Sequence, residues 1–161
     1  MIPITYLVGD ATHPQGDGVK IIAHICNDKG KWGAGFVLAL SKHWREPEEC
    51  YRHWLAKRLP GAVLLGAVQS VIVDDGSVVV ANMIAQTIGW IKGQPPIRYD
   101  ALRACLETVS QMAVKVAASV HMPRIGCGLA GGSWNQVEPI IADELCAHNV
   151  PVFVYDLPER K

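Results

Sequence analysis

The sequence predicts a three-layer α/β/α fold with a central mixed sheet, formed by residues 1–161 as one domain. Short segments rich in β-forming residues alternate with segments of helical periodicity. The strand expected over 20–26 is almost entirely apolar, which is typical of a strand covered by helices on both faces. No repeat, low-complexity tract or linker divides the chain. These observations together favour a central sheet between two layers of helices.

Turn-forming residues mark the elements of the first half of the chain. Gly9-Asp10 closes the first expected strand, and Asp74-Asp75-Gly76 suits the turn of a hairpin. Pro47 suits the first turn of a helix, where its missing N–H is not needed. We therefore expect strands over 4–8, 20–26, 65–73 and 78–84, and helices over 36–40 and 47–58.

The second half contains the clearest helix. Its apolar residues recur at three- and four-residue spacing and form one stripe: Leu102, Cys105, Leu106, Val109, Met112, Ala113 and Val116. The segment from Ser133 to Gln136 matches a capping box and predicts the start of another helix. That helix is expected to bury Val137, Ile140, Ile141 and Leu145. Strands over 119–125 and 151–155 and a loop over 86–97 complete the expected fold.

Composition and charge exclude several classes of function. Fifteen Lys and Arg residues balance fifteen Asp and Glu residues, so no net field attracts nucleic acid or a membrane surface. The five cysteines include no C-x-x-C pair, which favours a reducing compartment. The N-terminal segment lacks the features of a signal peptide. We expect a cytoplasmic protein without a membrane partner and without a cofactor.

The histidines and cysteines do not predict a metal site. His24 lies in an apolar strand, where a hydrogen-bonded core residue is the favoured interpretation. His121 and Cys127 come closest together, but nothing near them in the sequence completes a tetrahedral set. Backbone amides around Cys127 would lower the pKa of its thiol, yet no partner histidine is recognisable. We therefore expect no metal, and a packing role for Cys127.

The most informative segment is the glycine-rich loop over 124–132. Four glycines lie here between an expected strand and a capped helix. Glycine permits positive φ and lets a ligand approach the backbone N–H groups closely. The positive end of the following helix favours an anion. A tight turn without a ligand would need fewer glycines, so the loop predicts a phosphate site.

The same segment matches the dinucleotide-binding pattern G-x-G-x-x-G at Gly126, Gly128 and Gly131. Asp156 follows at a distance where a ribose-binding acid could lie. That pattern normally opens a nucleotide-binding fold, and only five residues follow Asp156. A dinucleotide-dependent oxidoreductase is therefore rejected.

A second glycine-rich loop covers 30–35 and also lies between a strand and a helix. It lacks the G-K-[ST] ending of a nucleoside-triphosphate loop. Two such loops in one small domain suggest two phosphates held from opposite sides, as in a diphosphate. Asp10 could accept a hydrogen bond from an exocyclic amine, Asn27 could hold a ribose hydroxyl, and Asp28 could orient a water. Each of these three residues also suits an ordinary turn or cap.

These segments resemble the macrodomain family, and within it the branch of the terminal ADP-ribose protein glycohydrolases and related bacterial proteins. The resemblance rests on residues 8–12, on 22–28 with 32–36, on 96–99 and on 122–129, in that order along the chain. The most specific block is Met122-Pro123-Arg124-Ile125-Gly126-Cys127-Gly128-Leu129. The resemblance implies a macrodomain that binds ADP-ribose.

The resemblance also implies roles for particular residues. Asp10 is expected to bind the adenine amine, and Asn27 to lie near the distal ribose. The two glycine loops are expected to bind the diphosphate. The full set of expected ligand-binding residues is Gly9, Asp10, Ala11, Gly33, Ala34, Gly35, Phe36, Gly126, Cys127, Gly128, Leu129, Ala130, Gly131, Gly132 and Tyr155. The expected catalytic residues are Asn27, Asp28 and Gln86.

Two departures bear on the chemistry. The glycohydrolases of this branch use a lysine at the end of the fourth strand, where this chain has Gln86, and a loop aspartate, where it has Ala130. A covalent lysine mechanism therefore does not transfer. We expect hydrolysis of mono-ADP-ribose from acidic side chains of proteins by positioning of the ribose and activation of a water. The alternatives are a non-catalytic ADP-ribose reader and an ADP-ribose 1″-phosphate phosphatase.

Overall fold

A computed structural model of the chain describes residues 1–158. The last three residues of the expected domain, 159–161, lie outside the described part. Six strands form one sheet in the order β1-β6-β5-β2-β4-β3. All neighbouring strands are parallel except β3, which runs antiparallel to β4. The expected central mixed sheet is confirmed.

The elements follow one another in β-α order with few exceptions. The strands are β1 (Thr5–Val8), β2 (Lys20–Asn27), β3 (Val68–Val73), β4 (Val78–Gln86), β5 (Ser119–Met122) and β6 (Val152–Asp156). The α-helices are α1 (Phe36–His43), α2 (Glu46–Ala56), α3 (Tyr99–Val116) and α4 (Trp134–Glu144). Short 3₁₀ turns at Asp74–Gly76 and Cys146–His148 complete the list.

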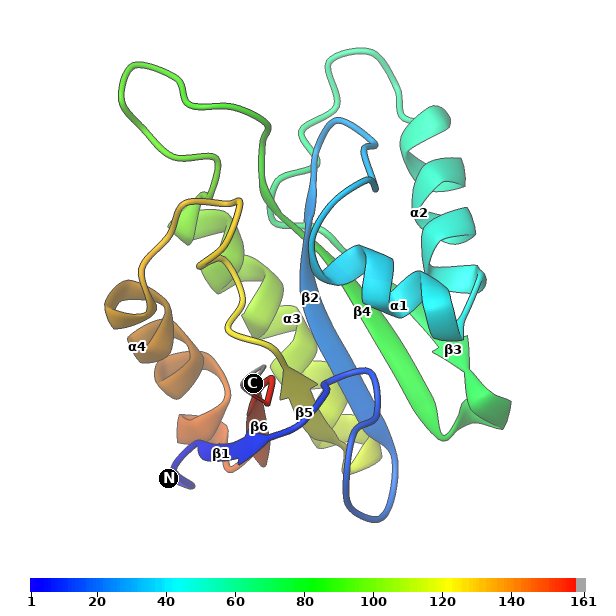
Figure 1. Cartoon of the computed structure of the whole chain (residues 1–161), viewed down its shortest axis with the longest axis vertical. Coiled ribbons are helices and arrows are strands. Elements are labelled where there is room, and N and C mark those ends of the chain that lie inside the picture. The colour runs from blue at the N-terminus through cyan, green and yellow to red at the C-terminus, as the bar shows by residue number, and fades with distance from the viewer. Residues whose placement is uncertain (159–161) are drawn as a thin grey trace.

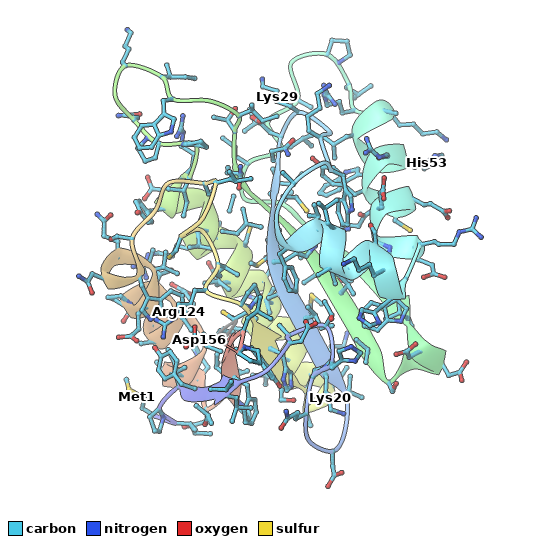
Figure 2. The ribbon with its side chains drawn as sticks, in the orientation of Figure 1. Met1, Lys20, Lys29, His53, Arg124 and Asp156 are labelled. Atoms are coloured by element: carbon cyan, nitrogen blue, oxygen red, sulfur yellow. The ribbon has the colours of Figure 1, made fainter. Side chains whose placement is uncertain are left out.

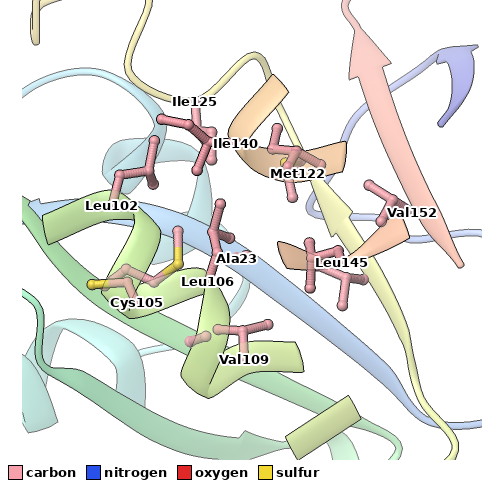
Figure 3. Close-up of a cluster of buried hydrophobic side chains, with 14 of the residues drawn as sticks. Ala23, Leu102, Cys105, Leu106, Val109, Met122, Ile125, Ile140, Leu145 and Val152 are labelled. Carbon is pink, nitrogen blue, oxygen red and sulfur yellow. The ribbon is translucent and has the colours of Figure 1, made fainter. Parts of the chain in front are cut away.

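The helices cover both faces of the sheet, which gives the three layers of Figure 1. Side chains of β2 alternate between the two faces because successive residues of a strand point in opposite directions. Ile21 and Ala23 pack with α3 and α4, and Ile22 packs with α1 and α2. Figure 3 shows part of the first of these cores, where Leu102 and Leu106 of α3 meet Ala23 of β2. The apolar pattern of β2 thus reflects its burial on both faces.

Several expected boundaries differ from the structure. The strand expected over 65–73 begins only at Val68, because Gly66 has a φ of 95° and forms a turn. The strand expected over 119–125 ends at Met122, directly before Pro123. Val116 was expected in the buried stripe of α3, yet it is 52% exposed at the helix end. Helix α4 begins after Ser133 as expected, but the Ser133 side chain makes no capping hydrogen bond.

Within residues 1–158, no helix has both the length and the apolar character required to cross a membrane.

The strand order positions the functional loops. Strands β2 and β5 are parallel neighbours, and each is followed by one of the two glycine-rich loops. The chain leaves β2 toward α1 on one face of the sheet and leaves β5 toward α4 on the other face (Figure 1). In open α/β sheets, ligands bind at such a point, beyond the carboxyl ends of the strands. The fold therefore brings both loops to one edge of the sheet.

Candidate functional site

A cleft lies between the two glycine-rich loops at this edge. It has two adjoining parts, with volumes of about 210 and 320 Å³. Both parts are lined by Ile25, Ala34, Val37, Gln86 and Leu129. The first part extends to Pro123 and Arg124, and the second extends to Asn27 and Lys31. The cleft is therefore elongated and crosses the carboxyl ends of β2 and β4.

The glycines of the two loops divide into two groups. A Cβ at Gly33, Gly35 or Gly128 would have no protein atom within 4 Å, so these glycines border open space. In contrast, a Cβ at Gly132 would lie 2.5 Å from the carbonyl oxygen of Gly126, and one at Gly131 would lie 2.9 Å from the ring of Trp90. Gly131 and Gly132 were expected to bind a ligand, and the structure gives them a packing role.

Backbone amides on both sides of the cleft have no partner in the protein. Within residues 1–158, no protein acceptor binds the N–H groups of the lining residues Ala34, Gly35, Phe36, Gly128, Leu129 and Ala130. Gly35 is the N-cap of α1, and no side chain caps that helix. The positive end of the α1 dipole therefore adds to the amides of the first loop. Two opposed sets of free donors can bind an anionic group with two phosphates.

Of the expected catalytic residues, Gln86 has the central position. It ends β4, lines both parts of the cleft, and its Nε2 donates to the Thr87 carbonyl oxygen at 3.1 Å. Its Oε1 makes no hydrogen bond within the described part of the chain. The Gln86 side chain can therefore accept a hydrogen bond from a sugar hydroxyl or a water.

Asn27 lines the second part of the cleft, and most of its hydrogen-bonding capacity orders the first loop. Its Oδ1 accepts from the N–H of Lys29 at 3.0 Å and from that of Lys31 at 3.1 Å, and its Nδ2 donates to the Lys31 carbonyl oxygen at 2.8 Å. The Tyr51 hydroxyl lies 3.0 Å from the same Oδ1 and accepts from the N–H of Gly30 at 3.1 Å. Asn27 and Tyr51 together hold the loop in shape.

A family model described as the Macro domain matches residues 23–141. The chain belongs to the macro domain family. A solved structure from Bacteroides thetaiotaomicron is 55% identical, covers 97% of this chain and 99% of its own, and has a TM-score of 0.92. A macrodomain protein from Streptomyces coelicolor is 51% identical, with coverage of 95% and 98% and a TM-score of 0.83.

Curated relatives are more distant. The mouse chromodomain-helicase-DNA-binding protein 1-like is 33% identical over 98% of this chain, which spans only 18% of that protein. The bovine ADP-ribose glycohydrolase OARD1 is 28% identical, with coverage of 96% of this chain and 91% of its own. An ADP-ribose 1″-phosphate phosphatase from Candida albicans is 24% identical, with coverage of 87% and 92%.

In this macro domain the Gly9-Asp10 turn adjoins the first part of the cleft. The N–H of Gly9 donates to the carbonyl oxygen of Asp156, whose carboxylate is paired with Arg124 of the cleft wall (Figure 2). Asp10 Oδ1 accepts from the backbone N–H and the hydroxyl of Thr12, at 2.8 and 2.7 Å. Burial acts to raise the pKa of Asp10, but these hydrogen bonds and two nearby histidines hold it below its ordinary value. Asp10 is therefore ionised at neutral pH.

Ala11, Tyr155 and Asp28 are among the expected site residues that lie away from the open cleft. Ala11 is 3% exposed, and Tyr155 is also 3% exposed beneath the Gly9 turn. The Tyr155 hydroxyl accepts from the N–H of Gln15 at 2.9 Å and lies 2.8 Å from His121 Nδ1. Asp28 lines neither part of the cleft, and its Oδ1 is buried without a hydrogen-bond partner. In the structure, Ala11 and Tyr155 support the turn, and Asp28 lies in the turn that directly follows β2.

Cys127 was expected both to pack and to belong to the ligand-binding set, but it lines neither part of the cleft and packs against the core of α3 and α4. The expected lowering of its thiol pKa was wrong. Burial raises the pKa of the Cys127 thiol, and Arg124 opposes this only in part. Its Sγ donates to the carbonyl oxygen of Ile125 at 3.4 Å. His24 is likewise a core residue, with Nε2 placed 2.6 Å from Oδ1 of Asn82.

The sequence did not indicate several residues of the cleft. Ile25 and Val37 line both parts of the cleft, and Lys31 and Ile88 line its second part. Leu129, expected only as a phosphate-loop residue, is 73% exposed at the mouth. The alternation of side chains along β2 could have placed Ile25 in the cleft, because it lies two residues before Asn27 and therefore on the same face of the strand. Nothing in the sequence could have indicated Tyr51, since it reaches the site from α2.

Proposed function

We propose that this macro domain binds ADP-ribose in the cleft and hydrolyses mono-ADP-ribose from acidic side chains of proteins. The observation that supports this most is the presence of two sets of free amides on opposite sides of one elongated cleft. Two phosphates in series present acceptors in both directions. A single phosphate would leave one set of amides without a partner.

The cleft also gives the ligand a direction. Adenine belongs at the first part, where the Gly9-Asp10 turn leaves Asp10 Oδ2 available for the exocyclic amine. The diphosphate lies between the loops, and the distal ribose lies in the second part near Gln86 and Asn27. The modified side chain of a partner protein then leaves the cleft past Ile88 and Leu129, which are 45% and 73% exposed.

The chemistry follows from the leaving group. A carboxylate ester at the distal ribose is activated toward attack by water, so positioning supplies much of the required rate. Gln86 Oε1 can orient that water, which attacks C1″ of the distal ribose. The bond from C1″ to the side-chain oxygen breaks, the carboxylate leaves with the electron pair, and a phosphate oxygen of the substrate accepts the proton of the water. The bovine relative named ADP-ribose glycohydrolase supports hydrolysis of an ADP-ribosyl bond, and the fungal relative named ADP-ribose 1″-phosphate phosphatase supports hydrolysis of a substituent at the same 1″ position.

One experiment compares three substrates with the purified protein: glutamate-linked mono-ADP-ribose, serine-linked mono-ADP-ribose and ADP-ribose 1″-phosphate. We expect release from the glutamate-linked substrate, and none from the serine-linked one, because an acetal has a poorer leaving group than an ester. The Gly128→Glu variant, which blocks the cleft, provides the control for contaminating hydrolases. Turnover of the 1″-phosphate alone would make the protein a phosphatase, and binding without turnover would make it a reader.

A further inference from the structure

Three side chains that are distant in the sequence converge beside the proposed adenine end of the cleft. Asp10 follows β1, His13 lies in the next loop, and His43 ends α1. One ligand atom from each residue lies within 4.8 Å of the other two. The imidazole rings of His13 and His43 are nearly perpendicular, with centroids 4.2 Å apart. Two nitrogens and one carboxylate oxygen thus lie close enough to one another to bind one ion.

No internal hydrogen bond accounts for this convergence. Within residues 1–158, the imidazoles of His13 and His43 make no hydrogen bond to protein. The carboxylate of Asp10 is oriented from one side only, because both of its hydrogen bonds come from Thr12 to Oδ1. Oδ2 remains available. In metal sites, a carboxylate that binds the ion is typically oriented by hydrogen bonds from neighbouring residues, as Thr12 orients Asp10 here.

We propose that Asp10, His13 and His43 bind one divalent transition-metal ion, with Zn²⁺ as the best match. Two imidazole nitrogens and one carboxylate oxygen are a ligand set that zinc and its first-row neighbours accept. Water can complete the coordination, because a hollow of about 420 Å³ adjoins the two histidines. The charged residues of that hollow are Lys20 and Asp74, and the Lys20 ammonium donates to the Gly18 carbonyl oxygen at 3.0 Å.

A metal ion at this site would compete with ADP-ribose for Asp10, a consequence that rests on the proposed function. Adenine recognition and metal binding both require Oδ2 of Asp10, because Oδ1 is used by Thr12. The two events therefore exclude one another. Metal bound at this site therefore raises the apparent Kd for ADP-ribose, and ADP-ribose raises the apparent Kd for the metal.

The test uses untagged protein of residues 1–161, freed of metal with a chelator. Titration with ZnCl₂ by calorimetry should give one ion bound per chain. Titration with Co²⁺ should give a visible absorption spectrum that differs from that of the hydrated ion. The double variant His13→Ala/His43→Ala should lose affinity by at least on the order of a hundredfold, since loss of outer-shell partners alone costs about 10–100-fold. Both histidines are exposed, so circular dichroism should show an intact fold.

The matched control is His53→Ala/His148→Ala, which removes two exposed histidines elsewhere and should bind Zn²⁺ like the wild type. Equal binding by the His13→Ala/His43→Ala variant would assign the metal to other groups, such as the thiols, and overturn the proposal. Absence of binding by the wild type up to millimolar Zn²⁺ would do the same. Failure of the proposed function is separate, because it appears as absent ADP-ribose binding in metal-free protein.

If both proposals hold, Zn²⁺ raises the Kd for ADP-ribose in the wild type and in the His53→Ala/His148→Ala control, but not in the His13→Ala/His43→Ala variant. The last variant also corrects for Zn²⁺ bound by the diphosphate in solution. An equal effect of Zn²⁺ on all three proteins would contradict the competition.

Discussion

Asn27 and Gln86 are register partners at the carboxyl ends of β2 and β4, and they meet because the register shifts by one residue between Cys26 and Asn27. Cys26 pairs with Ile84, so without this shift Asn27 would pair with Ala85, which is buried. A bulge of this kind redirects side chains at the end of a strand. Here it places two amide side chains side by side at the second part of the cleft.

Replacement of Gln86 tests whether this pair acts in the reaction. We expect Gln86→Ala to slow release from a glutamate-linked substrate by roughly 10- to 100-fold, because water and ribose lose an acceptor in the transition state. The Kd for ADP-ribose should change by less than about tenfold, or 1.4 kcal/mol. Single-turnover release and calorimetry give the two values. Gln111→Ala, on the exposed side of α3, should match the wild type.

Two glycines of one loop should respond in opposite ways. Gly128 borders open space, so Gly128→Glu should abolish ADP-ribose binding and change the free energy of unfolding by less than about 0.5 kcal/mol. Gly132 faces the Gly126 carbonyl oxygen, so Gly132→Ala should lower the free energy of unfolding by about 1–3 kcal/mol. Urea unfolding and calorimetry separate these effects. Retained ADP-ribose binding by Gly128→Glu would place the ligand elsewhere.

Asp10→Asn separates adenine recognition from support of the turn. The asparagine oxygen can still accept both hydrogen bonds from Thr12, but its amide replaces the free Oδ2. The loss of one charge-assisted hydrogen bond should weaken ADP-ribose binding by about 1.5–3 kcal/mol. Ribose 5-phosphate, which lacks adenine, should bind unchanged. If both ligands weaken equally in calorimetry, Asp10 serves the fold and not the base.

Two buried histidines should make the fold sensitive to acid. Burial lowers the pKa of His24 and of His121 from 6.5 to about 4. Between pH 6.5 and about pH 4, the unfolded chain binds protons at these histidines and the folded chain does not. The contribution of the neutral histidines to the free energy of unfolding is therefore fully present above pH 6.5 and is lost as the pH is lowered. The slope should reach about 1.4 kcal/mol per pH unit for each histidine.

Urea unfolding between pH 7 and pH 5 measures this slope. This pH window lies above the range in which most carboxylates titrate. His121→Gln should make the slope shallower, whereas His148→Ala, which removes an exposed imidazole, should leave it unchanged. An identical slope in the His121→Gln variant would mean that His121 already binds a proton in the folded state.

Hydrolysis should proceed without a covalent lysine intermediate. Gln86 ends β4 and cannot form a Schiff base, and the lysine that lines the cleft, Lys31, is exposed. Treatment with ADP-ribose and cyanoborohydride should therefore leave the protein mass unchanged, and Lys31→Ala should retain release. An adduct that maps to Lys31 by mass spectrometry would replace the proposed water mechanism with a covalent one.

The local features of this chain were determined by its sequence. The apolar run of β2 and the stripe of α3 predict buried elements because their periodicities match those of a strand and a helix. Glycine content and flanking elements predicted phosphate sites in the loops over 30–35 and 124–132, and the structure places both loops at one cleft. The strand expected over 78–84 ended two residues too early, and only the family resemblance placed Gln86 at the end of β4. Each of these features depends on residues that are close together in the sequence.

Only the tertiary structure decided which of these features meet. The pairing of β2 with β5 brings the two glycine loops to one cleft, and a bulge selects Gln86 as the partner of Asn27. Tyr51 reaches Asn27 from α2, and His43 reaches Asp10 from α1. The residues of the proposed metal site leave no local motif in the sequence, because His43 lies 33 positions after Asp10. Strand order and helix packing set such contacts, and neither leaves a periodic trace in the sequence.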